Sequence, residues 1–205
     1  MKKVFSVLMV LVFALSVAAC GSGNNNAPQN SSTSSQSSAS STEQAQPKQE
    51  APKEDPNATA DQKNAAKKAR NYATGSMAMS LDKIRNQLVQ FDKFSEADAE
   101  YAVSKLTDID WNKVALKKAE SYTKTIGMAK SKIPNQLVQF EGFTQEQADY
   151  AVANLKADFK EIAARKAKNY QQQQNMSVDG VRHQMLEFEG FTEEEVEYAI
   201  SKLQK

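Results

Sequence analysis

The chain has 205 residues, with 26 lysine or arginine side chains against 25 aspartate or glutamate side chains, which gives a formal net charge of +1. A chain so close to neutrality has no global field that would steer it toward nucleic acid or an anionic surface. It contains a single cysteine, so an intrachain disulfide is excluded. The folded part of the chain must therefore be held together by packing alone.

The first residues are typical of a targeting segment that is removed from the mature protein. Two lysines precede an apolar run over residues 4–17, which is too short for a permanent membrane span. The run ends in two small residues, Ala18 and Ala19, directly before Cys20. This order predicts a lipoprotein signal peptide over 1–19, cleavage between Ala19 and Cys20, and lipid attachment to the Cys20 thiol. An ordinary secretory signal cleaved near Ala19 is the alternative.

A cysteine that carries two or three acyl chains gives stable anchoring, whereas one chain alone does not. We therefore expect the protein to bind the cell membrane through this lipid and to face the extracytoplasmic side. Residues 20–58 are rich in Ser, Asn, Gln and Pro and lack an apolar pattern. Such a segment cannot bury enough apolar surface to offset the entropy of ordering, so it is predicted to be a disordered linker.

The rest of the chain is an internal repeat. The sequence Asn-Gln-Leu-Val-Gln-Phe occurs at 86–91 and again at 135–140. Aromatic residues recur at matching spacing in three sets: Tyr72, Tyr122 and Tyr170; Phe94, Phe143 and Phe191; and Tyr101, Tyr150 and Tyr198. We predict three copies of one unit of about 48 residues, over 59–110, 111–158 and 159–205.

Each copy shows the spacing of three helices, so the predicted class is all-α. The first helix carries small residues at steps of three and four that end at the repeated tyrosine, as in Ala65, Ala69 and Tyr72. The second has a predicted buried stripe that includes Phe91, Phe140 and Phe188. The third begins at the predicted N-caps Ser95, Thr144 and Thr192, each followed three residues later by Asp, Gln or Glu as in a capping box.

The ends of the second helix are also marked. Serine residues are its predicted N-caps, namely Ser80, Ser177 and, shifted by two positions in the second copy, Ser131. Gly142 and Gly190 are suited to the left-handed conformation that commonly ends a helix, whereas Lys93 takes that place in the first copy. A helix, a short turn and a capped helix make a helix-turn-helix unit.

Units this small have small cores, so we expect neighbouring copies to pack on one another. Trp111 and Phe159, at the start of the second and third copies, are the predicted contacts. Asp61 stands at the equivalent position of the first copy, as suits the exposed end of an array.

Three blocks of this pattern resemble the Ltp-like family of host cell surface-exposed lipoproteins. They are the first helix from Trp111 to Tyr122, Met79-Ser80 followed by Gln87-Leu88, and Gly142-Phe143-Thr144 followed by Tyr150-Ala151-Val152. A glycine that is frequent in the family before the aliphatic residue of the second helix is kept only as Gly180, which leaves the start of that helix open. The resemblance implies superinfection exclusion, in which a lipoprotein outside the host membrane blocks DNA entry by acting on the injection machinery of a phage.

Helix-turn-helix units do not by themselves imply DNA binding. The third helices are acidic, as in Glu193, Glu194 and Glu195, and would repel phosphate. His183 is the single histidine, and neither a metal-ligand spacing nor a phosphate loop is present, so we predict no enzyme and no cofactor. The predicted function is protein–protein interaction with a phage injection component or an envelope protein. A housekeeping envelope module is the alternative, and the oligomeric state is open.

Overall fold

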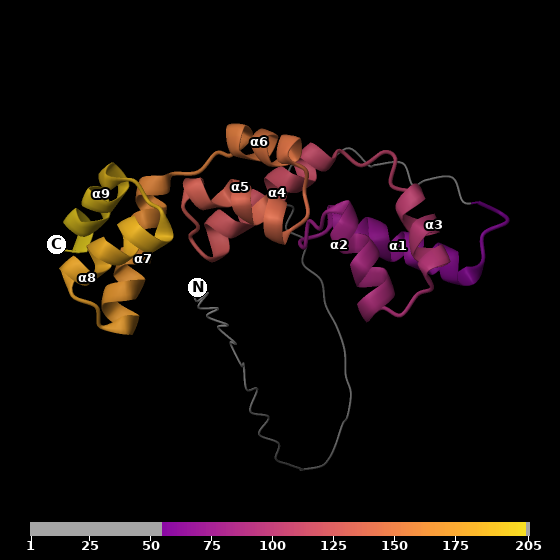
Figure 1. The fold of residues 1–205 in the computed structure, drawn as a ribbon, viewed down its shortest axis with the longest axis horizontal. Helices are drawn as coiled ribbons and strands as arrows, with labels where there is room; N and C mark the ends of the chain where they lie inside the picture. Colours follow the sequence, from indigo (N-terminus) through magenta and orange to yellow (C-terminus); the bar gives the residue numbers. More distant parts are fainter. Residues whose placement is uncertain (1–54, 204–205) are drawn as a thin grey trace, which may run out of the picture. The chain divides into compact units, whose positions relative to one another are not determined.

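The computed structural model describes residues 55–203 of the chain. Regular structure in this range is helical throughout, which confirms the predicted all-α class (Figure 1). Cys20, the predicted signal peptide and the linker up to residue 54 lie outside the described residues. Among the described helices, none has both the length and the apolar character needed to cross a bilayer.

Each repeat holds a long first helix, a short second helix that widens into a π-helical turn, and a third helix (Figure 1). The first repeat comprises α1 (Ala60–Thr74), α2 (Leu81–Asn86), η1 (Gln87–Phe91) and α3 (Glu96–Ser104). The second comprises α4 (Trp111–Thr125), η2 (Lys130–Lys132), α5 (Ile133–Asn135), η3 (Gln136–Phe140) and α6 (Gln145–Asn154). The third comprises α7 (Phe159–Gln174), α8 (Val178–His183), η4 (Gln184–Glu189) and α9 (Glu193–Leu203).

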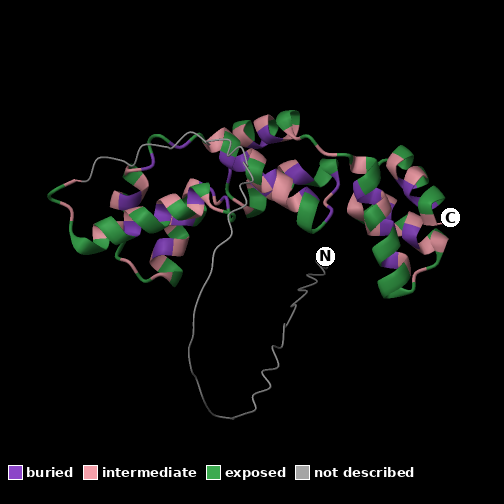
Figure 2. Ribbon diagram, turned by 180° about the vertical axis from the view of Figure 1, so that it is seen from behind, coloured by how far each residue is buried: buried purple, intermediate pink, exposed green. Residues whose placement is uncertain are grey.

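Small side chains bring the first and third helices of each repeat together, and these pairs make the most extensive contacts in the fold. In the first repeat Ala65 and Ala69 on α1 and Ala102 on α3 are fully buried. The second helix supplies the larger side chains, Ile84 and Leu88, which are also fully buried. Buried residues recur in this way in all three repeats (Figure 2). Within residues 55–203, the buried core residues thus come from all three repeats.

The third helices begin at side-chain caps. Thr144 and Gln147 form a complete capping box, in which each side chain bonds to the backbone N–H of the other residue. Thr192 and Glu195 bond in the same reciprocal way. The Ser95 hydroxyl accepts a bond from the Asp98 backbone N–H. These bonds satisfy donors that have no partner within the helix.

The second helix starts differently in the second repeat. Ser80 and Ser177 accept bonds from the third helical residue, as N-caps do. Ser131 does not, so its prediction as a cap is wrong. The third helical residue after Ser131 would be Pro134, which has no N–H to donate. The chain instead begins this helix with the 3₁₀ turn η2, and the Ser131 hydroxyl bonds elsewhere.

Two positions of every repeat have positive φ. One precedes the methionine that leads into the second helix, and the other follows the π-helical turn. The first set is Ala78, Gly127 and Asn175, and the second is Lys93, Gly142 and Gly190. Lys93, with a φ of 63°, holds the left-handed conformation that glycine adopts in the other two repeats at no steric cost.

Candidate functional site

A lysine, a carboxylate and a tyrosine form the same cluster in each repeat. In the first, the Tyr72 hydroxyl donates to Asp92 over 2.8 Å, and Lys68 Nζ lies 2.7 Å from the other oxygen of that carboxylate. The equivalent clusters are Tyr122, Glu141 and Lys118 in the second repeat and Tyr170, Glu189 and Lys166 in the third. The cluster fastens the end of the second helix to the first helix.

Burial sets the ionisation of these tyrosines. It raises the pKa of Tyr122 to about 12, and the hydrogen bond to Glu141 adds to that rise. Burial and Glu189 raise the pKa of Tyr170 to about 12 in the same way. Both phenols therefore stay protonated near neutral pH and donate to a carboxylate. The sequence held a signal for these clusters, since an acidic residue follows each tyrosine of the first helix by 19 or 20 positions.

The repeats join through cations that meet the end of the preceding first helix. Lys118 also donates to the Met77 carbonyl oxygen over 2.8 Å, and Lys117 to that of Thr74 over 2.7 Å. At the next joint Lys166 bonds the Ile126 carbonyl and Arg165 that of Thr123. Carbonyl groups at a helix C-terminus lack partners within the helix and attract cations. The same two positions thus hold both joints together.

Side-chain exposure confirms that each joint is covered. Lys118 and Lys166, which lie at joints, are 17% and 18% exposed. Lys68, their equivalent in the first repeat, is 48% exposed. The difference arises because the described residues hold no repeat before the first one.

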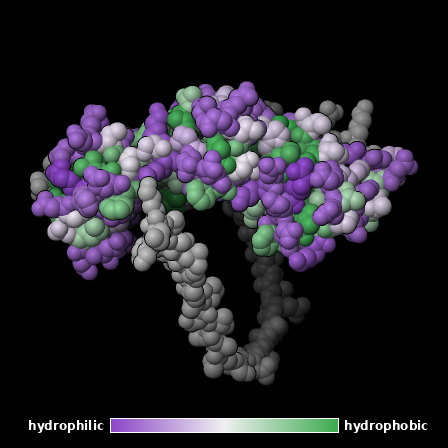
Figure 3. Space-filling model, viewed as in Figure 1, coloured by the Kyte–Doolittle hydropathy of each residue, from purple (hydrophilic) through white to green (hydrophobic). Residues whose placement is uncertain are grey.

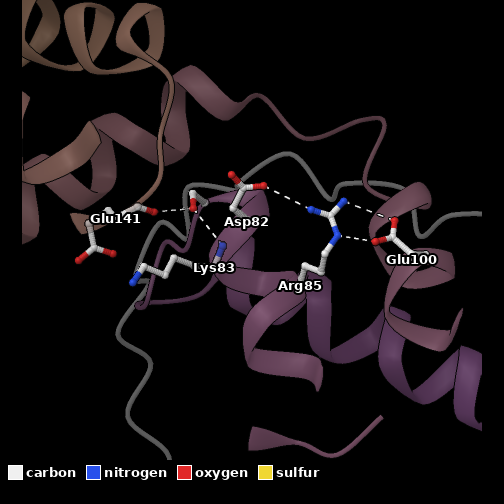
Figure 4. Close-up of polar contacts among 6 residues, drawn as sticks. Asp82, Lys83, Arg85, Glu100 and Glu141 are labelled. Atoms are coloured by element: carbon white, nitrogen blue, oxygen red, sulfur yellow. Dashed lines mark hydrogen bonds and ion pairs between the residues drawn. The ribbon is translucent and has the colours of Figure 1, made fainter. Parts of the chain in front are cut away.

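A serine completes each joint. The Ser80 hydroxyl donates to the Glu141 carbonyl oxygen over 2.5 Å while it accepts a bond from the Lys83 backbone N–H (Figure 4). Ser131 bonds the Gly190 carbonyl over 2.7 Å in the next joint. Arg85, one turn along α2, pairs with Glu100 on α3, so this helix contacts its own repeat as well as the next one (Figure 4).

Of the two predicted aromatic contacts, Phe159 packs against both hydrophobic clusters of the fold, one built mainly from the third repeat and the other from the first two. Trp111 packs against the cluster that the first two repeats share. Asp61 is exposed at the start of the first repeat.

Beside each joint lies a groove, and the two grooves are built alike. We call them the joint grooves; their volumes are about 310 and 320 Å³. The first is lined by Met79, Lys83, Asn86, Gln87, Lys118 and Glu141. The second is lined by the six equivalent residues Met128, Lys132, Asn135, Gln136, Lys166 and Glu189. Phe91 borders the first groove, and Phe188 and Ile126 border the second.

Three phenylalanines are exposed at the same position of the three repeats. Phe91, Phe140 and Phe188 are 73%, 58% and 61% exposed, so the prediction that they belong to a buried stripe is wrong. Ile84 and Leu88 are buried at α-helical spacing, but the backbone forms a π-helical turn from Gln87 to Phe91, and the next stripe position, Phe91, faces solvent. Apolar patches of this kind interrupt an otherwise hydrophilic surface (Figure 3).

The remaining residues singled out from the sequence do not form a catalytic or metal-binding cluster among the described residues. His183 is exposed, and its ring meets that of Phe188 edge-on with centroids 5.7 Å apart. Tyr101, Tyr150 and Tyr198 are half-buried on the third helices. In the part of the chain that the structure describes, no group of three or more His, Cys, Asp or Glu residues is placed to hold a metal ion.

Comparison with known proteins gives a family. The model of the host cell surface-exposed lipoprotein family matches residues 61–106, 110–155 and 158–203. The structure of Ltp, a superinfection exclusion protein from the Streptococcus thermophilus temperate phage TP-J34, shares 47% sequence identity, with a TM-score of 0.45. That match covers 48% of this chain and 99% of the other. No curated protein matches the chain. Because the three matched segments together cover more than half of the chain, this chain belongs to the host cell surface-exposed lipoprotein family.

Proposed function

We propose that this protein acts at the cell surface in superinfection exclusion, where it binds a protein of an incoming phage and blocks DNA entry. The observation that carries the proposal is the exposure of Phe91, Phe140 and Phe188 at one repeated position. Leaving a large apolar side chain in water forgoes roughly 1.5–3 kcal/mol of burial energy. Apolar patches and aromatic anchors of this kind are typical of protein-binding surfaces.

Family membership supports the biological setting of this binding surface. The resemblance described above implies exclusion of superinfecting phage, and the family model matches all three repeats. Lipid attachment at Cys20 would hold the repeats at the outer face of the membrane, where an injecting phage must pass.

The charge arrangement favours a protein partner over nucleic acid. Lys118 and Lys166 on the first helices are engaged by carboxylates and by carbonyl groups at the joints. They are therefore not free to bind phosphate groups. On the third helices the exposed Glu193 and Glu194 would repel a phosphate backbone.

The test is phage infection of a sensitive host that expresses the full chain. Wild type should reduce DNA entry by phages within a broad panel. The triple variant Phe91→Ser, Phe140→Ser, Phe188→Ser should lose most of that reduction at an unchanged protein level, because the apolar anchors are gone while the core is intact.

A matched control uses the exposed residue directly before each phenylalanine: Gln90→Ser, Gln139→Ser and Glu187→Ser. This variant changes the same turns and should exclude phage like the wild type. Unchanged DNA entry with wild-type protein across the panel would overturn the proposal and favour a housekeeping envelope module.

The anchor has a separate test. Cys20→Ser removes the thiol that would take the lipid, so the precursor should leave the detergent phase of a Triton X-114 partition and lose exclusion. A variant that still partitions into detergent would show that Cys20 does not carry the anchor.

A further inference from the structure

We propose that the two joint grooves, each with an exposed phenylalanine at its edge, form one track, which binds a single polypeptide segment that carries apolar and acidic side chains. This inference rests on the proposed function and adds where the partner binds and what its chemistry is.

The repeat symmetry links the two grooves. Phe91 borders the first groove from the repeat before the joint, and Phe188 borders the second groove from the repeat after the joint. Phe140 is the equivalent of Phe91 at the second joint and of Phe188 at the first. Phe140 itself lines neither groove, so each groove has one exposed phenylalanine at its edge.

The remaining exposed apolar residues belong to the same track. Ile126, which is 54% exposed, lines the second groove. Met77, which is 51% exposed, lies at the first joint, where its carbonyl oxygen accepts the bond from Lys118. Four of the five large exposed apolar side chains of the described residues thus lie beside the joints, and concentrated apolar surface that is exposed to water marks a binding site.

The shape of the surface favours a polypeptide over a lipid bilayer. Volumes of about 310 and 320 Å³ place the grooves at the small end of the range for ligand pockets, roughly 300–1,000 Å³. A flat membrane surface cannot enter such hollows, whereas successive side chains of one segment can. Several apolar anchors at intervals are also how an amphipathic helix is held in a groove.

The charge of the grooves selects acidic side chains. Lys118 and Glu141 neutralise one another in the first groove, as Lys166 and Glu189 do in the second. Lys83 and Lys132 remain. Both are exposed, and neither forms an ion pair within residues 55–203. Each groove therefore offers one cation next to an apolar wall, which suits a carboxylate that lies beside an apolar side chain.

The experiment uses residues 50–205, the compact unit that holds the core residues of all three repeats. Two fluorescein-labelled helical peptides of about 18 residues carry the same leucine stripe, one with glutamate and the other with lysine at the remaining positions. Fluorescence anisotropy should show that the glutamate peptide binds at least about tenfold more tightly, a difference of about 1.4 kcal/mol.

Variants locate the binding surface. Lys83→Gln with Lys132→Gln should remove most of the preference for the glutamate peptide, whereas Lys63→Gln with Lys130→Gln, at exposed positions outside the grooves, should leave it unchanged. Phe91→Ser and Phe188→Ser should each weaken binding more than Phe140→Ser, because Phe91 and Phe188 each line a groove and Phe140 lines neither.

Equal binding of the two peptides would overturn the proposal, and so would a groove variant that behaves like its control. Binding to phosphatidylglycerol vesicles without binding to either peptide would also overturn it and identify a membrane surface.

The infection assay separates the two proposals. If the phenylalanine variant loses exclusion while Lys83→Gln with Lys132→Gln keeps both exclusion and the peptide preference, the track is wrong and the proposed function stands. If the wild type binds the glutamate peptide but does not exclude phage, the proposed function is wrong and the track stands.

Discussion

The hydroxyl oxygen of Ser80 lies 2.5 Å from the backbone carbonyl oxygen of Glu141, although the two residues are 61 positions apart. The same contact joins Ser131 to Gly190 at the next joint, over 2.7 Å. At both joints a serine before or within the second helix thus reaches the turn that ends the second helix of the following repeat. Because the serine hydroxyl bonds a backbone carbonyl, this contact depends on the close approach of two segments of the chain and not on a matched pair of side chains.

Ser80→Ala should destabilise the fold more than Ser177→Ala does. Both serines cap a second helix, which is worth about 1 kcal/mol. Ser80 is buried and also bonds the Glu141 carbonyl, so its loss should cost about 1–2 kcal/mol more. Ser177 makes no such second bond among the described residues. Urea unfolding of both variants measures the difference, and equal losses would show that the joint bond contributes nothing.

Lys93→Gly should stabilise the protein by about 0.5–1 kcal/mol. Lys93 has a φ of 63°, where a side chain costs more than the backbone entropy that glycine adds to the unfolded chain. Gly190→Ala should act in the opposite direction, by about 1–3 kcal/mol. A Cβ there would lie 2.5 Å from Ser131 Oγ and 2.9 Å from Lys132 Cε. Thermal unfolding checks both signs; a loss of stability in Lys93→Gly would contradict this account of the turn.

Leu88→Ala and Phe91→Ala should differ sharply although they lie three residues apart. Leu88 is fully buried, and its truncation should cost about 2–5 kcal/mol. Phe91 is 73% exposed, so its truncation should change stability by less than about 0.5 kcal/mol. Chemical denaturation of the two variants tests the exposure of Phe91 directly. A large loss in Phe91→Ala would place that ring in the core.

The sequence predicted the elements of the repeat because their signals are local. Thr144 with Gln147 reads as a capping box in the sequence and forms one in the structure, since the bond spans three residues. The buried positions of Ile84 and Leu88 follow from α-helical spacing in the same way. Phe91 departs from this spacing because the backbone from Gln87 to Phe91 forms a π-helical turn, which no single residue of the sequence indicates.

The grooves could not be predicted, because their walls come from two repeats. Lys118 bonds the backbone carbonyl oxygen of Met77, and a sequence does not indicate which backbone carbonyls will accept such bonds. The clusters of tyrosine, lysine and carboxylate do have a sequence signal, because every copy has a tyrosine and an acidic residue at the spacing of Tyr122 and Glu141.

The tyrosine clusters should make stability fall in alkaline solution. The pKa values of Tyr122 and Tyr170 are about 12 in the folded protein, whereas tyrosine in an unfolded chain titrates near 10. Between these values the folded state binds more protons than the unfolded state. The contribution of the two phenols is therefore fully present below pH ~10 and is lost as the pH rises toward ~12.

Unfolding free energies measured from about pH 9 to 11.5 should decline less steeply in Tyr122→Phe with Tyr170→Phe than in the wild type. Lysine deprotonation occurs in the same range, but it affects both proteins alike and cancels in the comparison. Tyr150→Phe is the control, since the Tyr150 hydroxyl makes no hydrogen bond among the described residues, and it should follow the wild-type curve. Parallel curves for all three proteins would mean that the carboxylate bonds of Tyr122 and Tyr170 do not hold the second helices to the first.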